Sequence, residues 1–148
     1  MYKHILAPTD GSALSLKAVK SAAKLAKALG ARVSGLYVMP ENLPPVYGEA
    51  SLYITAVSPT SFKAAIEKQA KAALDAAEKV VRASRVAFAG VKTTGGEPWS
   101  AIVKTARSRK CDLIVMASHG RRGLSGFLLG SETTKVLTHS KVPVLVCR

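Results

Sequence analysis

The sequence has few cysteines, few aromatic residues and no long apolar run. Its 148 residues include only Cys111 and Cys147, and aromatic residues make up 5% of the chain. Two cysteines without metal-ligand spacing exclude a disulfide framework and indicate reduced thiols. No run reaches the roughly 18 apolar residues that a membrane-spanning helix requires. The first residues form a strand-like run without the apolar region of a signal peptide, so we expect a cytoplasmic protein.

Acidic residues are also scarce, with 9 against 22 lysines and arginines and a net charge of +13. Such an excess is compatible with nucleic acid, an acidic membrane surface or an anionic ligand. The basic residues are dispersed, however, and Lys17, Lys20, Lys24 and Lys27 predict the solvated face of a helix. No basic run is interleaved with stacking aromatic residues. We therefore expect no specific nucleic-acid partner and no membrane partner, while weak nonspecific attraction to polyanions stays open.

Strand-like and helix-like segments alternate along the chain, and nearly half of the residues are apolar. The predicted strands are residues 2–8, Arg32–Met39, Val91–Thr94, Leu113–Ala117 and Val142–Cys147. The predicted helices are Ser12–Leu29, Thr60 to about Val86, Pro98 to about Arg109, and a short helix from Ser131. Ser12 caps the first helix and Gly30 closes it. This alternation indicates one βαβ-type sheet domain over residues 1–148 with right-handed crossovers.

Two regions lie outside this regular pattern. The first is Pro40–Pro59, where four prolines predict a long irregular connection. It also carries apolar residues, which favour either a lid or a surface covered by another chain: Tyr47, Leu52, Tyr53, Ile54 and Val57. The second region follows the strand Leu113–Ala117 and is rich in glycine.

Four glycines (Gly120, Gly123, Gly126 and Gly130) fall within eleven residues of this second region. Glycine lets backbone N–H groups approach and surround an anion. The helix that opens at Ser131-Glu132 adds unpaired N–H groups, and we expect the Ser131 hydroxyl to cap it. Arg121 and Arg122 bring cations to the same loop. The segment therefore predicts a phosphate-binding loop, the alternative being a surface loop rich in turn residues.

The common nucleotide-binding and nucleotide-transferring motifs are missing. No lysine follows the glycines as a P-loop requires, and no G-x-G-x-x-G is present. The H-x-G-H and S-G-G-x-D-S signatures of adenylate chemistry are absent too. His119 is placed to touch a phosphate or to orient the loop, but no recognisable nucleophile or acid–base pair accompanies it. We therefore expect no catalytic residue.

The end of the first strand supplies a second candidate element, Pro8-Thr9-Asp10-Gly11-Ser12. If the strand order is 3-2-1-4-5, strands 1 and 4 are neighbours whose connections leave in opposite directions. Asp10 and residues 117–131 then face one crevice beyond the carboxyl ends of the strands. A carboxylate there can accept hydrogen bonds from ribose hydroxyls. The alternative, that Asp10 only shapes the turn, stays open.

The glycine spacing resembles the G-x2-G-x9-G-[ST] loop of the universal stress protein family. Gly120, residues 121–129 and Gly130-Ser131 match this loop, whereas the first glycine of the motif falls on Ala117. The opening Ile5–Ser12 and the ending Lys141–Val146 are similar as well, so the resemblance spans the chain. It implies a single Rossmann-like, doubly wound, five-stranded parallel sheet of order 3-2-1-4-5 with helices on both faces.

The same resemblance implies that the protein binds ATP, with Mg²⁺ accompanying the nucleotide. Asp10 is implied at the ribose, Gly120, Gly130 and Ser131 at the phosphates, and the backbone of Val38 at the adenine. The full set of candidate nucleotide-binding residues is Pro8, Thr9, Asp10, Val38, Ala117, His119, Gly120, Arg121, Arg122, Gly123, Gly130, Ser131 and Glu132. The implied function is a regulatory, stress-response protein with little or no turnover. The alternatives are a slow ATPase or adenylate-handling enzyme of a related fold, and an interaction module without nucleotide.

The last predicted strand, Val142–Cys147, is an edge strand in this order and carries almost no charge. Apolar edges pair with other chains unless they are protected. Pro143 removes one donor near the start of the strand, which is tolerated at an edge. We therefore expect a homodimer formed by antiparallel pairing of two such strands. The alternative is that a helix or the Pro40–Pro59 segment covers the edge within one chain.

Overall fold

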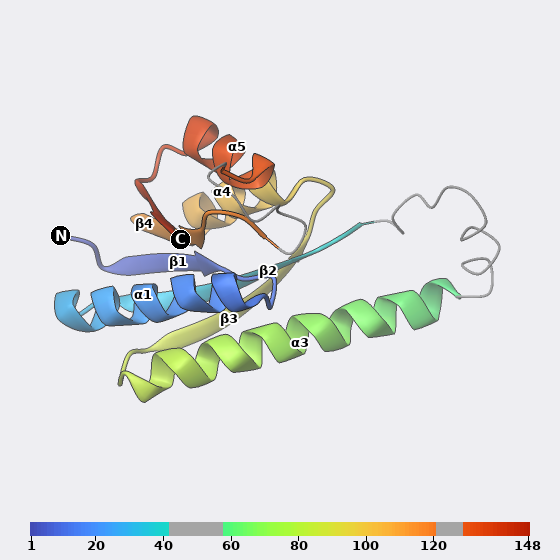
Figure 1. Cartoon of the computed structure of the whole chain (residues 1–148), viewed down its shortest axis with the longest axis horizontal. Coiled ribbons are helices and arrows are strands. Elements are labelled where there is room, and N and C mark those ends of the chain that lie inside the picture. Colours follow the sequence, from blue (N-terminus) through green and yellow to red (C-terminus); the bar gives the residue numbers. More distant parts are fainter. Residues whose placement is uncertain (42–57, 121–128) are drawn as a thin grey trace.

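The computed structural model describes residues 1–41, 58–120 and 129–148. Five parallel strands form one sheet in the order β3-β2-β1-β4-β5, as predicted (Figure 1). The strands are β1 (His4–Pro8), β2 (Arg32–Met39), β3 (Phe88–Thr94), β4 (Leu113–Ala117) and β5 (Val144–Cys147). The helices are α1 (Ala13–Leu29), α3 (Pro59–Ala83), α4 (Pro98–Ser108) and α5 (Ser131–His139).

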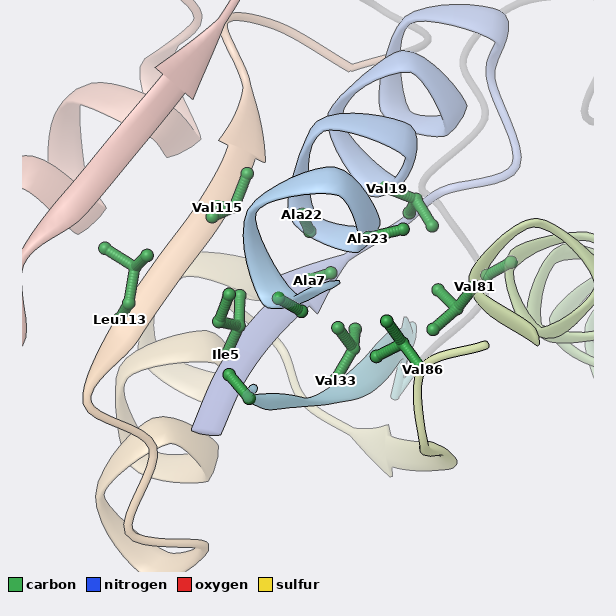
Figure 2. Close-up of a cluster of buried hydrophobic side chains, with 13 residues drawn as sticks. Ile5, Ala7, Val19, Ala22, Ala23, Val33, Val81, Val86, Leu113 and Val115 are labelled. Carbon is green, nitrogen blue, oxygen red and sulfur yellow. The ribbon is translucent and has the colours of Figure 1, made fainter. Parts of the chain in front are cut away.

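The helices cover both faces of the sheet, which confirms the doubly wound fold. α1 and α3 pack on one face, where side chains of β1, β2 and β4 gather beneath α1 (Figure 2). α4 and α5 pack on the other face. Successive residues of β1 alternate between the two layers, so that Ile5 faces the first and Leu6 the second, and both are fully buried. Burial of each such side chain stabilises the fold by about 1.5–3 kcal/mol.

Helix α1 lies close to the sheet because most of its buried residues are alanines. Its ends are as predicted. The Ser12 side chain accepts a hydrogen bond from the Ser15 N–H at 3.2 Å, and Gly30 ends the helix with φ +64°. The left-handed conformation of Gly30 is one that glycine adopts without strain.

Several boundaries differ from the prediction. β5 begins at Val144 instead of Val142, because Pro143 has no N–H to donate, although its carbonyl accepts the Ile114 N–H at 2.9 Å. β1 begins at His4 instead of residue 2. The long helix begins at Pro59 and ends at Ala83 instead of Val86, since Arg85 takes a left-handed backbone with φ +59°. Such a residue cannot continue a right-handed helix.

Strand β3 begins at Phe88, three residues before the predicted start at Val91. Phe88 pairs with Val33, and its ring lies over Gly35 of the neighbouring strand. A Cβ placed on Gly35 would lie 2.6 Å from the Phe88 Cζ. The absence of a side chain at Gly35 therefore makes room for the ring and extends the strand.

Other expectations concern the connection and the cysteines. Residues 42–57, with the apolar set from Tyr47 to Val57, lie outside the described residues, so the lid hypothesis stays a prediction.

Neither Cys111 nor Cys147 forms a disulfide. Burial raises the pKa of the Cys111 thiol to about 11, which keeps it protonated at neutral pH. Over the described ranges, no helix combines the length and apolar character needed to cross a membrane.

We expect Gly35→Ala to lower the free energy of unfolding by about 1–3 kcal/mol, because the added methyl group must displace the Phe88 ring. Gly90 is the register partner of Gly35 and provides a matched control. Its added Cβ would meet its nearest neighbours at an ordinary 3.7 Å, so Gly90→Ala should be neutral or slightly stabilising. Urea denaturation of the two variants measures the difference, and equal stabilities would contradict the role assigned to Gly35.

Candidate functional site

The carboxyl ends of β1 and β4 are where the sheet changes direction. These strands are neighbours, with Ile5 paired to Leu113 and Leu6 to Ile114. The connection after β1 leads to α1 on one face, and the connection after β4 leads to α5 on the other. In open α/β sheets, ligands bind at such a switch point. The two predicted site segments therefore lie at the expected place in the fold.

Asp10 and Gly120 are in direct contact across this switch point. A Cβ placed on Gly120 would lie 2.8 Å from the Asp10 Oδ2. The other carboxylate oxygen, Oδ1, accepts the Ser12 N–H at 2.9 Å. Asp10 thus shapes the turn before α1 and also presents its carboxylate to the glycine-rich loop. The turn-shaping role is therefore observed, and the expected contact with a ribose stays a prediction.

The two ends of the glycine-rich loop are held together by hydrogen bonds. The Gly130 N–H donates to the Ser118 carbonyl at 2.8 Å, and the Thr133 hydroxyl donates to the Ala117 carbonyl at 3.0 Å. Gly130 has an ordinary φ of −63°, so glycine is not required there for its backbone conformation. It permits a close approach instead, since a Cβ would lie 3.1 Å from the His119 Cα and the neighbouring backbone would have to shift.

The start of α5 differs from the prediction. Gly130 is the N-cap residue and Ser131 the first residue of the helix, so the expected capping role of the Ser131 hydroxyl is wrong. No side chain caps this helix. The N–H groups of the first turn have no partner within a helix, and they carry a partial positive charge. This N-terminus is therefore suited to an anion.

Glu132 is engaged with a neighbouring helix. Its Oε2 accepts the Trp99 N–H at 2.8 Å, in the first turn of α4. Its Oε1 lies 3.6 Å from the Lys135 Nζ, which is also 3.6 Å from the Glu97 Oε1. Glu97 is the N-cap residue of α4 and makes no side-chain capping bond. Glu132 therefore acts as the acceptor for the start of α4.

Thr9, Pro8 and Val38 lie near the same edge of the sheet. Thr9 is buried, and its hydroxyl bonds to the Ser15 hydroxyl at 3.0 Å and accepts the Gly11 N–H at 3.2 Å. Its side chain therefore supports the loop from within. Pro8 ends β1 opposite Leu36, and half-buried Val38 lies two residues farther along β2. Val38 is thus placed one strand away from Asp10.

Ala117, where the family motif has glycine, is accommodated without strain. It is a buried residue of β4, and among the described non-glycine residues only Arg85 and Lys110 have a positive φ. His119 is half-buried, with its Nδ1 at 3.2 Å from the Ser118 hydroxyl. The remaining predicted residues, Arg121, Arg122 and Gly123, lie outside the described part of the chain.

Ser118 and Thr133 are the residues that sequence reasoning missed. Ser118 is buried. Its N–H donates to the Cys147 carbonyl at 2.8 Å, and its own carbonyl accepts the hydrogen bond from the Gly130 N–H. Together with Thr133, it fixes the loop ends to each other and to β5. The sequence carried one signal for the role of Thr133. It lies in the first turn of α5, just after the last glycine of the loop, where a hydroxyl is common.

An open, doubly wound parallel sheet with glycines beside its switch point defines a Rossmann-like protein. Within this class, the chain belongs to the universal stress protein family, whose model matches residues 1–148. It is similar to the universal stress protein MJ0531 of Methanocaldococcus jannaschii, with 33% identity over 150 residues that cover 100% of this chain and 83% of that protein.

Solved structures support the same assignment. The structure of protein MJ0577, from the same organism, superposes with a TM-score of 0.79 at 29% identity, covering 99% of this chain and 96% of that one. A universal stress protein solved in complex with cAMP superposes with a TM-score of 0.67 at 26% identity, covering 99% and 97%.

We expect Glu132→Ala to lower the free energy of unfolding by about 1 kcal/mol, because the first turn of α4 loses its acceptor. Glu97→Ala is the matched control, since it also loses the contact with Lys135 but leaves the Trp99 N–H paired. Chemical denaturation measures both variants. If Glu97→Ala destabilises the protein as much as Glu132→Ala, the hydrogen bond to Trp99 is not the stabilising contact.

Proposed function

We propose that this protein binds ATP at the carboxyl ends of β1 and β4 and acts in the cytoplasm as a regulatory stress-response protein. The observation that carries this proposal is the contact between Asp10 and Gly120, which brings a carboxylate to the glycine-rich loop. A ribose requires hydrogen-bond acceptors, and its attached phosphates require donors and positive charge. The two segments provide these chemistries side by side.

The phosphates would be held by the loop and by the start of α5. The first-turn N–H groups of this helix have no side-chain cap, and helix N-termini bind phosphate through such donors. Gly120 and Ser131 would supply backbone contacts, and Gly130, which lacks a side chain, would let the phosphate approach closely. Arg121, Arg122 and Gly123 of the same loop would add donors and charge. Asp10 would accept hydrogen bonds from the ribose hydroxyls, and the backbone of Val38 would contact the adenine.

The comparisons support an adenine nucleotide as the ligand class. A family member that is 26% identical over nearly the whole chain was solved in complex with cAMP. This ligand shares adenine, ribose and a phosphate with ATP. Mg²⁺ would enter with the nucleotide, since no group of three His, Cys, Asp or Glu side chains suited to a metal lies within the described ranges.

We infer little or no turnover. Hydrolysis requires a base or a well-positioned water. In the described part of the site, the imidazole of His119 bonds to Ser118 and the Oδ1 of Asp10 accepts the Ser12 N–H. Nucleotide occupancy would then serve as the signal.

ATP should bind measurably in isothermal titration calorimetry, and Gly130→Val should weaken binding at least about tenfold, or about 1.4 kcal/mol. The branched side chain would push the start of α5 away from His119 and displace the phosphate donors. Gly90→Val, on exposed strand β3, is the control and should bind normally. Asp10→Ala should lose the preference of the wild type for ATP over dATP.

Three results would contradict this reading. A folded protein that shows no ATP binding at millimolar concentrations would remove the proposed ligand and favour the interaction module without nucleotide. An unchanged ribose preference in Asp10→Ala would remove Asp10 from the site. Release of several phosphates per second, abolished by a loop mutation, would make the protein an enzyme.

We further propose a homodimer formed through β5. This strand is an edge of the sheet, and Leu145 is 43% exposed although it lies in an apolar strand. Val144 faces inward, where it packs against the core on the side of α4 and α5. Antiparallel pairing of two β5 strands about a two-fold axis would pair the backbone N–H and carbonyl groups of both edge strands. It would also cover Leu145 of each copy.

Leu145→Lys should convert a dimer into a monomer in sedimentation experiments at micromolar concentration, because paired strands would bring two like charges together. Leu145 is a better test than Val144, whose replacement would also disturb the core. Thr138→Lys adds the same charge to an exposed position of α5 and should leave the dimer intact. A wild-type protein that sediments as a monomer would refute the proposal.

A further inference from the structure

The outer face of α1 carries four lysines and no acid. Lys17, Lys20, Lys24 and Lys27 are all exposed, and they lie opposite the buried alanines. The row from Lys17 to Lys27 spans ten residue steps, or about 15 Å of helix axis at a rise of 1.5 Å per residue. The helix contains no aspartate or glutamate that could neutralise it.

The neighbouring helix on the same face of the sheet is built differently. On α3, Lys71 pairs with Asp75, Arg82 pairs with Glu78, and Glu67 pairs with Lys92 of β3. None of the ion pairs found among the described residues involves a lysine of α1. Like charges three or four residues apart destabilise a helix, and the helix dipole favours a cation only in the last turn, at Lys27. Folding alone therefore does not account for the row.

The positive charge continues beyond the end of α1. Gly30, which ends the helix, lines a cavity of about 520 Å³ together with Lys3, Arg32 and Lys110. Asp112 also lines it and carries one negative charge against these three cations; its two oxygens accept the N–H groups of Lys3 at 2.7 Å and of His4 at 3.0 Å.

One of these cations, Arg32, is held in place by a side-chain contact. The Arg32 Nη2 lies 3.2 Å from the His4 Nδ1, and burial, with help from the Arg32 charge, lowers the pKa of His4. A neutral His4 can accept a hydrogen bond from the guanidinium. Lys110 has φ +55°, a conformation that glycine adopts more easily. We call the four lysines of α1 with Lys3, Arg32 and Lys110 the basic surface.

The chemistry of the basic surface selects its partner. The exposed large apolar residues of the described chain, which are Met1, Leu129, Leu137 and Leu145, all lie outside α1, so the row lacks the anchors of a membrane-surface helix. It also lacks aromatic side chains on which single-stranded bases could stack. A straight row of flexible point charges suits the phosphate backbone of a duplex, which carries one charge per about 1.7 Å.

We propose that the basic surface binds double-stranded nucleic acid through its phosphates, without sequence preference. This binding does not depend on the nucleotide site. Every phosphate contact releases counterions. The logarithm of the binding constant therefore falls linearly with the logarithm of the salt concentration, and the slope is proportional to the number of lysines engaged.

The test is fluorescence anisotropy with two short labelled duplexes of unrelated sequence, between about 50 and 200 mM salt. Both duplexes should bind alike. The double variant Lys20→Gln/Lys24→Gln should weaken binding about tenfold at the lowest salt concentration. It should also reduce the magnitude of the slope of log K against log salt by about 2. Lys63→Gln/Lys68→Gln removes the same charge from exposed positions of α3 and should change affinity less than about twofold.

Circular dichroism and urea denaturation establish that both double variants are folded. Equal weakening by the α1 and α3 variants would show that only net charge matters and would overturn the proposal. Failure of the wild-type protein to bind either duplex at the lowest salt concentration would overturn the proposal as well. Vesicles of phosphatidylcholine and phosphatidylserine are the other probe, and binding to them in place of the duplex, lost in Lys20→Gln/Lys24→Gln, would assign the surface to a membrane.

Discussion

The contact between Gly130 and the backbone of Ser118 and His119 is the constraint on which the candidate site depends. The hydrogen bond from the Gly130 N–H to the Ser118 carbonyl contributes about 0.5–1.5 kcal/mol, which is modest. The close approach matters more, because a Cβ at residue 130 would lie 3.1 Å from the His119 Cα. Without this close approach, the hydrogen bond from the Thr133 hydroxyl to the Ala117 carbonyl would lengthen too. The start of α5 would move away from the end of β4, and its anion-compatible N–H groups would lie farther from the loop end at Gly120 that contacts Asp10.

Much of the fold could be predicted because a parallel sheet buried on both faces produces uninterrupted apolar strands. The bounds of β2 and β4 match the predicted Arg32–Met39 and Leu113–Ala117. The start of β3 could not be predicted in the same way. Phe88 joins the sheet because Gly35, more than fifty residues earlier, leaves room for its ring. Such a relation between strands leaves no trace in the local pattern around Phe88.

The candidate site was predictable to the extent that topology determines it. The order 3-2-1-4-5 places the ends of β1 and β4 together, and Asp10 consequently meets Gly120. At the start of α5, the capping expected of the Ser131 hydroxyl was wrong, and the partner of the Glu132 carboxylate could not be predicted. Gly130 takes the N-cap position, and the carboxylate of Glu132 turns to the first turn of α4, whose proximity no local pattern shows.

The clamp formed by Asp112 has a consequence for biosynthesis. This carboxylate holds the backbone at the start of β1, across 109 residues of sequence. At about 5–20 residues per second, the ribosome takes roughly 5–20 s to make the intervening chain. During that interval β1 can pair with β2, but the backbone N–H and carbonyl groups on its other side have no strand to pair with. The sheet can therefore close around its central strand only after synthesis has passed residue 112 and β4 has emerged.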